Sequence, residues 1–140
     1  MQQILIPLPH ECRKASTSYL MSIMSLVAGL PLPVANLLAT VGYYLGYRND
    51  TYFVRWHCVQ AILTQIFILP FNSVAFWWGI SIYLNTRILS TEYLAYVLFV
   101  VNLNVIELAF TIYTVSAVHK GINVRWPVYA AITDRIVSTN

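Results

Sequence analysis

The chain has 140 residues, of which 59% are hydrophobic and only 9% are charged, and its net charge is +3. About a quarter of the residues in a soluble domain are charged, and a soluble domain of this size leaves much of its surface in water. The composition therefore argues against a soluble enzyme, a disordered tail, a coiled coil and a nucleic-acid-binding module. It predicts an integral membrane protein whose partner is the lipid bilayer.

We expect a single transmembrane domain over residues 1–140. The predicted class is all-α, a polytopic membrane protein with about four apolar helical segments. These segments leave too few residues for a separate soluble domain. The charge excess is small and scattered along the chain, so we interpret it as a topology signal and expect no nucleic-acid partner.

The first apolar segment, residues 15–47, contains no Asp, Glu, Lys, Arg or His. One span needs about 20 residues, so this segment is too long for one upright span. Pro31 and Pro33 each remove a backbone donor and disfavour helix in the residue before them. We therefore predict a helix break at these prolines, between short pieces at about 18–30 and 34–47. The segment is either a Pro-broken hairpin or one tilted span.

Two further apolar segments, 53–83 and 93–118, are each predicted to be a membrane helix. Pro70 lies inside the first of them, and Glu107 is the one charged residue of the second. Tyr and Trp residues cluster near the ends of both segments, as they do where helices meet the headgroups.

The remaining residues, 119–140, are predicted to form an interfacial tail. Gly121 is suited to end the preceding helix, because glycine commonly follows the last helical turn. Pro127 is suited to begin a short interfacial helix, because proline is tolerated in a first turn.

The eight Lys and Arg residues discriminate between the two arrangements of the first segment. A single span places Arg13, Lys14 and Arg87 on one side and the other five on the opposite side. A hairpin leaves Arg87 alone on its side, and the positive-inside rule favours this stronger bias. We therefore prefer the hairpin, with both termini on the cytoplasmic or equivalent side of a bacterial inner membrane or an organelle inner membrane.

The densest polar cluster opens the second segment. His57, Gln60 and Thr64 share a helix face by their spacing, and Arg55 lies beside them. One interpretation is a polar track or a docking site for a partner. The other is interfacial anchoring, with Arg55 among the headgroups and His57 bonded to a neighbouring carbonyl.

A second polar stripe follows the third segment. Asn104, Glu107, Thr111 and Thr114 share one helix face, and Asn102 lies on another. A carboxyl group inside a span is costly and marks a site by default. Glu107 is either a neutral carboxyl group bonded within the bundle or a site for a cation, a proton or a polar substrate. In an antiparallel helix pair, we expect this stripe to face the one on the second segment.

No catalytic motif is present, so we predict no enzymatic activity and no cofactor. Cys12 and Cys58 lack a CxxC spacing, and the three histidines are far apart in the sequence, so we predict no metal site.

Two stretches carry a family resemblance. Residues 44–63 read YLGYRNDTYFVRWHCVQAIL and residues 118–132 read VHKGINVRWPVYAAI. They resemble the xFVRFHxxQAL signature and the AxxGxxYRxP ending of the family of the chloroplast inner-envelope protein-import component (the twenty-kilodalton Tic subunit) and of related bacterial small membrane proteins of uncharacterised function. Trp56 stands where phenylalanine is commoner in that signature.

The resemblance implies four membrane helices, with the segment split at Pro31–Pro33 supplying two of them. It also implies membership of a multiprotein translocon, and it carries over signature positions with a structural role: Arg55, His57, Gln60, Gly121 and Pro127. We therefore predict a non-enzymatic membrane subunit, in protein translocation or secretion, that assembles with other membrane proteins or with copies of itself. The alternatives are a small transporter or channel using Glu107, and an orphan membrane enzyme.

Overall fold

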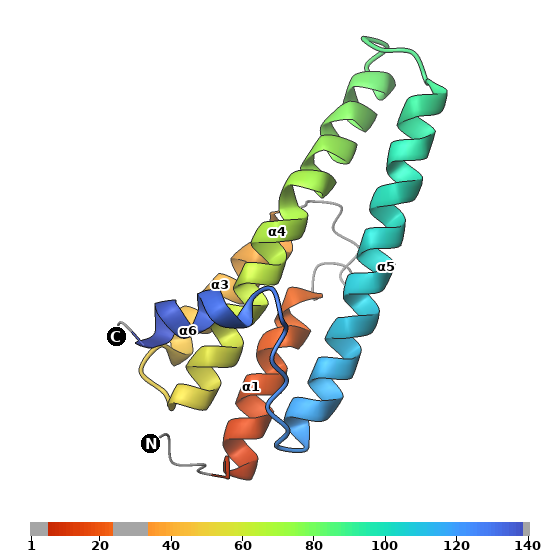
Figure 1. Ribbon diagram of the computed structural model, residues 1–140. Coiled ribbons are helices and arrows are strands. Elements are labelled where there is room, and N and C mark those ends of the chain that lie inside the picture. Colours follow the sequence, from red (N-terminus) through yellow and green to blue (C-terminus); the bar gives the residue numbers. More distant parts are fainter. Residues whose placement is uncertain (1–5, 24–33, 139–140) are drawn as a thin grey trace.

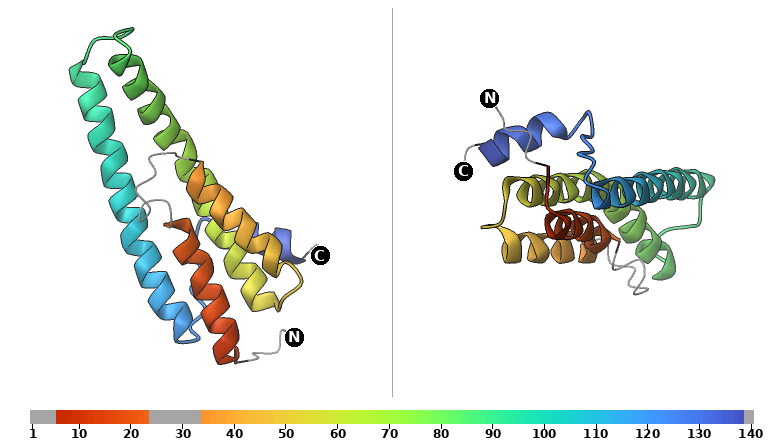
Figure 2. Two further views of the ribbon diagram at one scale, coloured as in Figure 1. Left: turned by 180° about the vertical axis from the view of Figure 1, so that it is seen from behind. Right: turned by 90° about the horizontal axis from the view of Figure 1, so that it is seen from below.

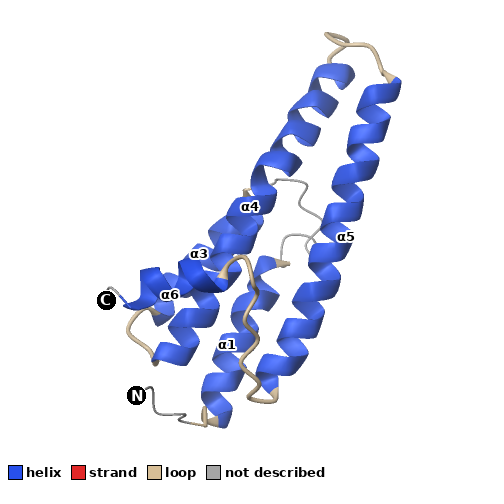
Figure 3. Cartoon of the chain, in the orientation of Figure 1, coloured by secondary structure: helices blue, strands red, loops and turns tan. Residues whose placement is uncertain are grey.

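The computed structural model describes residues 6–23 and 34–138 of the chain. Within these two ranges there are five α-helices and no strands, which confirms the all-helical class (Figure 3). The predicted helix break at Pro31 and Pro33 lies outside the described residues.

Helix α1 (Pro9–Ser22) begins nine residues earlier than the piece expected at 18–30. Pro9 occupies the first helical turn, where a missing backbone donor costs nothing. Glu11 then accepts a hydrogen bond from the backbone N–H of Leu8 at 2.7 Å, which satisfies a free donor at the helix start. The expected start was wrong because these signals lie in a charged stretch outside the apolar segment.

Helices α4 (Tyr52–Tyr83) and α5 (Thr91–His119) coincide with the expected segments to within two residues, and α4 continues through Pro70. These two are long and apolar enough to cross a membrane. Helix α3 (Ala35–Tyr47) has 13 residues and α1 has 14, lengths that fall short of a ~30 Å hydrocarbon core. Of the described helices, two and not four are therefore long and apolar enough to span a membrane, so the polytopic prediction is supported only in part.

The chain leaves α5 through Gly121, which has a φ of +80°. Glycine enters this left-handed region without the steric cost that a side chain brings. The last helix, α6 (Ala130–Ser138), starts three residues after Pro127. A turn comes first, in which the backbone N–H of Ala130 donates to the carbonyl of Trp126 at 2.8 Å.

Helix α1 lies between the lower halves of α4 and α5 and contacts both (Figures 1 and 2). Helix α3 packs on α4 and α1, and α6 packs on α4. The buried core is therefore in the lower half of the molecule. One apolar cluster joins α1, α4 and α5 and consists of Ala15, Tyr19, Ala61 and Val118. The other joins α4 and α6 and consists of Trp56, Val59, Ala130 and Val137.

The start of α1, the α3–α4 turn and the end of α5 all lie at one end of the molecule, and the α4–α5 turn lies at the other (Figure 1). An ion pair between Lys14 and Asp50, 2.6 Å apart, joins α1 to the α3–α4 turn. A single-span first segment would place these two residues at opposite ends of the molecule, whereas the contact places them at the same end. The sides of the membrane on which the basic residues lie stay a prediction.

Candidate functional site

A buried hydrogen-bond network connects α1 to α4. The amide of Gln60 donates to the hydroxyl oxygen of Tyr19 at 2.9 Å, and that hydroxyl lies 3.0 Å from Nδ1 of His57. Since the hydroxyl oxygen already accepts from Gln60, its own hydrogen is available to Nδ1, which then acts as the acceptor. All three side chains are 0–1% exposed, so this network is part of the core.

The second ring nitrogen of His57 takes no part in this network. Its Nε2 is buried without a hydrogen-bond partner among the described residues. The rings of Phe53 and Trp56 meet the imidazole edge to face, with centroids 4.6 and 5.0 Å away. These edge-to-face contacts pack the imidazole ring in place without offering Nε2 a polar partner.

Gln60 also ties α4 to the C-terminal segment. Its amide donates to the carbonyl of Val124 at 3.2 Å, and its side-chain oxygen accepts from the backbone N–H of Trp126 at 3.3 Å. The indole of Trp126 then donates to the hydroxyl of Thr114 on α5 at 3.0 Å. The segment after Gly121 is thus held across both long helices.

The predicted cluster on α4 is therefore brought together only in part. His57, Gln60 and Thr64 are buried on one face of the helix, and Thr64 donates to the carbonyl of Ala61 within its own helix at 2.8 Å. Arg55 does not join the network, and its Nε is buried without a hydrogen-bond partner among the described residues.

The predicted stripe on α5 faces α4, but it meets different residues from those expected. The amide of Gln65 donates to Oε1 of Glu107 at 2.5 Å. The amides of Asn72 and Asn104 donate to each other, at 3.1 and 2.7 Å. The expected partners on α4, Gln60 and Thr64, make no direct hydrogen bond to the stripe among the described residues, and Gln60 is joined to Thr114 only through Trp126.

The residues that sequence reasoning missed are Gln65 and Asn72. They are seven residues apart, and this spacing returns to the same helix face after two turns. The seven-residue spacing could have identified this face from the sequence. Of the remaining stripe, Thr111 and Thr114 are buried, and Thr114 also donates to the carbonyl of Phe110 at 2.8 Å.

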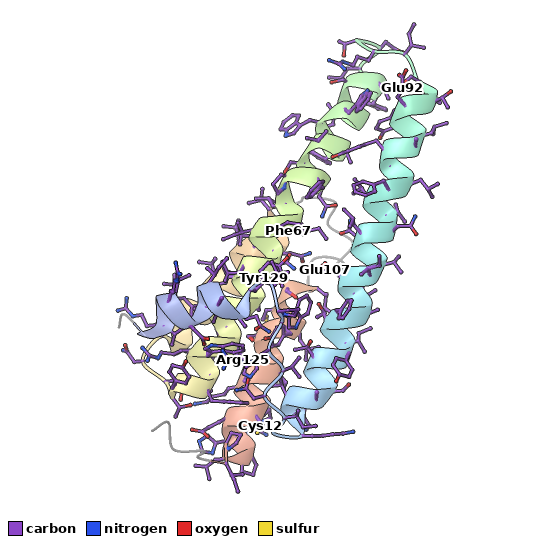
Figure 4. The ribbon with its side chains drawn as sticks, viewed as in Figure 1. Cys12, Phe67, Glu92, Glu107, Arg125 and Tyr129 are labelled. Atoms are coloured by element: carbon purple, nitrogen blue, oxygen red, sulfur yellow. The ribbon has the colours of Figure 1, made fainter. Side chains whose placement is uncertain are left out.

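A cleft of about 470 Å³ opens between α4, α5 and the C-terminal segment. Its walls are mostly apolar and aromatic, and Glu107 is the acidic residue among the residues that line it. Figure 4 shows Glu107 close to Phe67 and Tyr129, where the C-terminal segment crosses the two long helices. The Oε2 atom of Glu107 has no hydrogen-bond partner among the described residues.

A second surface feature runs along the outer side of α5. Small or polar residues recur at every seventh position of this side: Ala95, Asn102, Ala109 and Ser116. Large apolar residues lie between them, also seven positions apart: Leu98, Val105 and Ile112. All seven are exposed, and we call this set the outer face of α5. The Asn102 amide donates to the carbonyl of Leu98 at 2.8 Å, and its oxygen has no described partner.

Comparisons with protein-family models, with curated proteins and with solved structures found no match. The resemblance of residues 44–63 and 118–132 to the chloroplast import-component family therefore stays a prediction. Among the described residues there is also no group of three or more His, Cys, Asp or Glu side chains able to hold a metal ion.

Proposed function

We propose that the chain is a non-enzymatic integral membrane subunit that assembles with other membrane proteins or with copies of itself. The observation that carries this proposal is Asn102, a carboxamide near the middle of α5 on its exposed outer face. Its NH2 group donates one hydrogen bond to the carbonyl of Leu98, and lipid offers no partner to its oxygen or to its second N–H. A second helix packed on this face supplies one.

The rest of the outer face suits such a helix. Small residues let two membrane helices approach closely, and Ala95, Ala109 and Ser116 provide them at the same seven-residue interval as Asn102. A repeat of seven matches the slight left-handed crossing of packed helices. A single asparagine in such a repeat sets the register of the pair.

The charges support one orientation of the subunit. Arg13, Lys14 and Arg48 lie at the end of the molecule opposite the α4–α5 turn, which carries Arg87. By the positive-inside rule, the basic end faces the cytoplasm or its equivalent. Both termini are then on that side of a bacterial inner membrane or an organelle inner membrane.

A role in protein translocation or secretion is the finer part of the proposal. It draws on the resemblance of the two signature stretches, and it is supported by their contact with each other. Gln60 from the first stretch hydrogen-bonds to Val124 and Trp126 from the second. Two motifs far apart in sequence thus act as one structural unit.

The transporter alternative draws on Glu107, which lines the cleft. The walls of that cleft are mostly apolar, and apolar walls do not replace the hydration shell of an ion. Oε1 of Glu107 is also taken by Gln65. These contacts favour the subunit over the transporter.

The test is purification of the tagged full-length chain in a mild detergent, followed by mass spectrometry and a mass measurement of the particle. We expect co-purified membrane proteins or a mass of more than one copy. Asn102→Leu reduces this association about fivefold, since one interhelical hydrogen bond is worth roughly 1 kcal/mol.

The matched control is Val101→Leu, at the neighbouring exposed position outside the outer face. It keeps an apolar side chain of similar size, so the association should be retained. A lone monodisperse monomer from the wild-type chain would contradict the proposal, as would equal association of the two variants.

A further inference from the structure

The cleft beside Glu107 has the properties of a ligand site rather than of a packing defect. Its volume of about 470 Å³ falls within the ~300–1,000 Å³ range of small-molecule pockets. Most of the lining is aromatic or aliphatic, and its polar side chains include Glu107, Thr64, Thr114 and Arg125, the usual composition of a pocket that orients an apolar molecule through a few polar contacts. Phe67, Ile106, Phe110 and Tyr129 are among the walls.

Thr64 and Thr114 donate to carbonyls of their own helices, and Arg125 pairs with Asp134. The polar contact available to a ligand is therefore the second oxygen of Glu107. Gln65 holds the other oxygen at 2.5 Å and so fixes the orientation of the carboxyl group. Oε2 has no hydrogen-bond partner among the described residues, and the half-buried Glu107 side chain lines the cleft. A ligand in the cleft can therefore pair with it without breaking a hydrogen bond to any described residue.

The chemistry of the carboxyl group restricts the ligand. An ammonium group pairs only with the ionised carboxylate, and a carbonyl group pairs only with the protonated acid. A hydroxyl group both donates and accepts, so it pairs with Glu107 in either protonation state. The position of Glu107 near the middle of α5 also places it at the depth of lipid tails and away from the charged headgroups.

We infer that this cleft binds a lipid-soluble alcohol, an elongated apolar molecule whose single hydroxyl group pairs with Glu107. The apolar body lies against the aromatic walls between α4, α5 and residues 124–129. The site does not include the outer face of α5, so it does not depend on the proposed assembly.

The experiment uses the full-length chain in phosphatidylcholine vesicles and two photoreactive probes. One probe is a diazirine-bearing hexadecanol, and the other is the same chain with a methyl group in place of the hydroxyl. Peptide mapping then measures the labelling of cleft residues. We expect the alcohol to label them about fivefold more than the hydrocarbon, the ratio for one hydrogen bond of about 1 kcal/mol.

Two variants locate the site. Glu107→Leu removes the preference for the alcohol. Ile106→Trp fills the cleft and lowers labelling by both probes several-fold, and it disturbs no buried hydrogen bond. Val101→Trp is the control, because Val101 is 50% exposed against 53% for Ile106 and does not line the cleft. Its labelling should match the wild type.

Equal labelling by the two probes in the wild-type chain would overturn the inference. So would a preference for the alcohol that survives in Glu107→Leu, or a loss of labelling in Val101→Trp as large as in Ile106→Trp. A cleft occupied by another protein chain would exclude both probes and would also contradict it. Failure of the proposed assembly is a separate result, because Asn102→Leu is expected to leave the alcohol labelling unchanged.

Discussion

Polar side chains determine which helices contact which in this molecule. Tyr19, His57 and Gln60 are almost fully buried, and each hydrogen bond among them links α1 to α4. In a membrane protein such bonds average only about 0.6 kcal/mol. Their main effect is therefore on the register of the helix pair, because they fix which turn of α1 lies beside which turn of α4.

The polar faces could be predicted from residue spacing, but their partners could not. Asn104 and Glu107 were expected to face α4, and they do. The expected partner Gln60 instead binds Tyr19 and residues 124–126. Spacing along one helix identifies a face, whereas the residue opposite depends on where a third helix inserts.

The ion pair between Lys14 and Asp50 gives a prediction for pH dependence. The hydrogen bond from Lys14, 2.6 Å long, lowers the pKa of the Asp50 carboxyl below its ordinary value of 3.8. Because the folded pKa lies below the unfolded one, the contact stabilises the folded chain above that ordinary value. The stabilisation is lost as the pH falls through the folded pKa.

We predict that Asp50→Asn removes this component of the acid response. Thermal unfolding in mild detergent at pH 7 and pH 3 measures it: the loss of stability on acidification should be smaller in the variant than in the wild type. Glu92→Gln, a charge removal in the first turn of α5, is the control and should keep the wild-type response. An unchanged pH dependence in Asp50→Asn would refute this role.

At the scale of whole elements, the two long helices were predictable and the N-terminal helix was not. Hydropathy located α4 and α5 to within two residues, because a long uncharged stretch has few alternatives to a membrane helix. Helix α1 contains Glu11, Arg13 and Lys14, and a search for apolar runs passes over it. Capping residues, rather than hydropathy, mark where it begins.

The end of α5 depends on the backbone of Gly121. Its φ of +80° costs a non-glycine residue about 1 kcal/mol or more. A Cβ atom there would lie 3.7 Å from Sγ of Cys12 and 3.8 Å from Cγ of Pro7, which are ordinary contacts. We predict that Gly121→Ala destabilises the chain by about 1 kcal/mol through backbone strain alone, measured by chemical unfolding in detergent.

Gly42 provides the matched control. It lies inside α3, and a Cβ atom added to it would meet nothing within 4 Å. Alanine is the better helix former by about 1 kcal/mol, so Gly42→Ala should leave stability unchanged or raise it. If both substitutions shifted stability in the same direction by the same amount, the left-handed turn at Gly121 would not be the cause.

At the scale of the whole molecule, a tightly packed lower half contrasts with an upper half formed by α4 and α5 (Figure 1). Large apolar residues stay exposed along both helices, among them Phe67, Trp77, Leu98 and Val105. Water disfavours such a surface, and lipid accepts it. Hydropathy predicted the two long apolar helices, whereas the orientation inferred from counting charges stays a prediction. The packing of α1 between the long helices depends on tertiary contacts that no local pattern encodes.

The central claim is that the chain crosses the membrane through α4 and α5 and that the start of α1 lies on the same side of the membrane as the α3–α4 turn and the end of α5. Single cysteines in a Cys12→Ser, Cys58→Ala background test it directly, at the exposed positions His10, Arg48, Ile88 and Lys120. A membrane-impermeant maleimide is applied to sealed vesicles of each orientation. We predict that the cysteines at 10, 48 and 120 react from one side and the cysteine at 88 from the other. Labelling of all four from the same side, or of positions 10 and 88 together, would contradict the account.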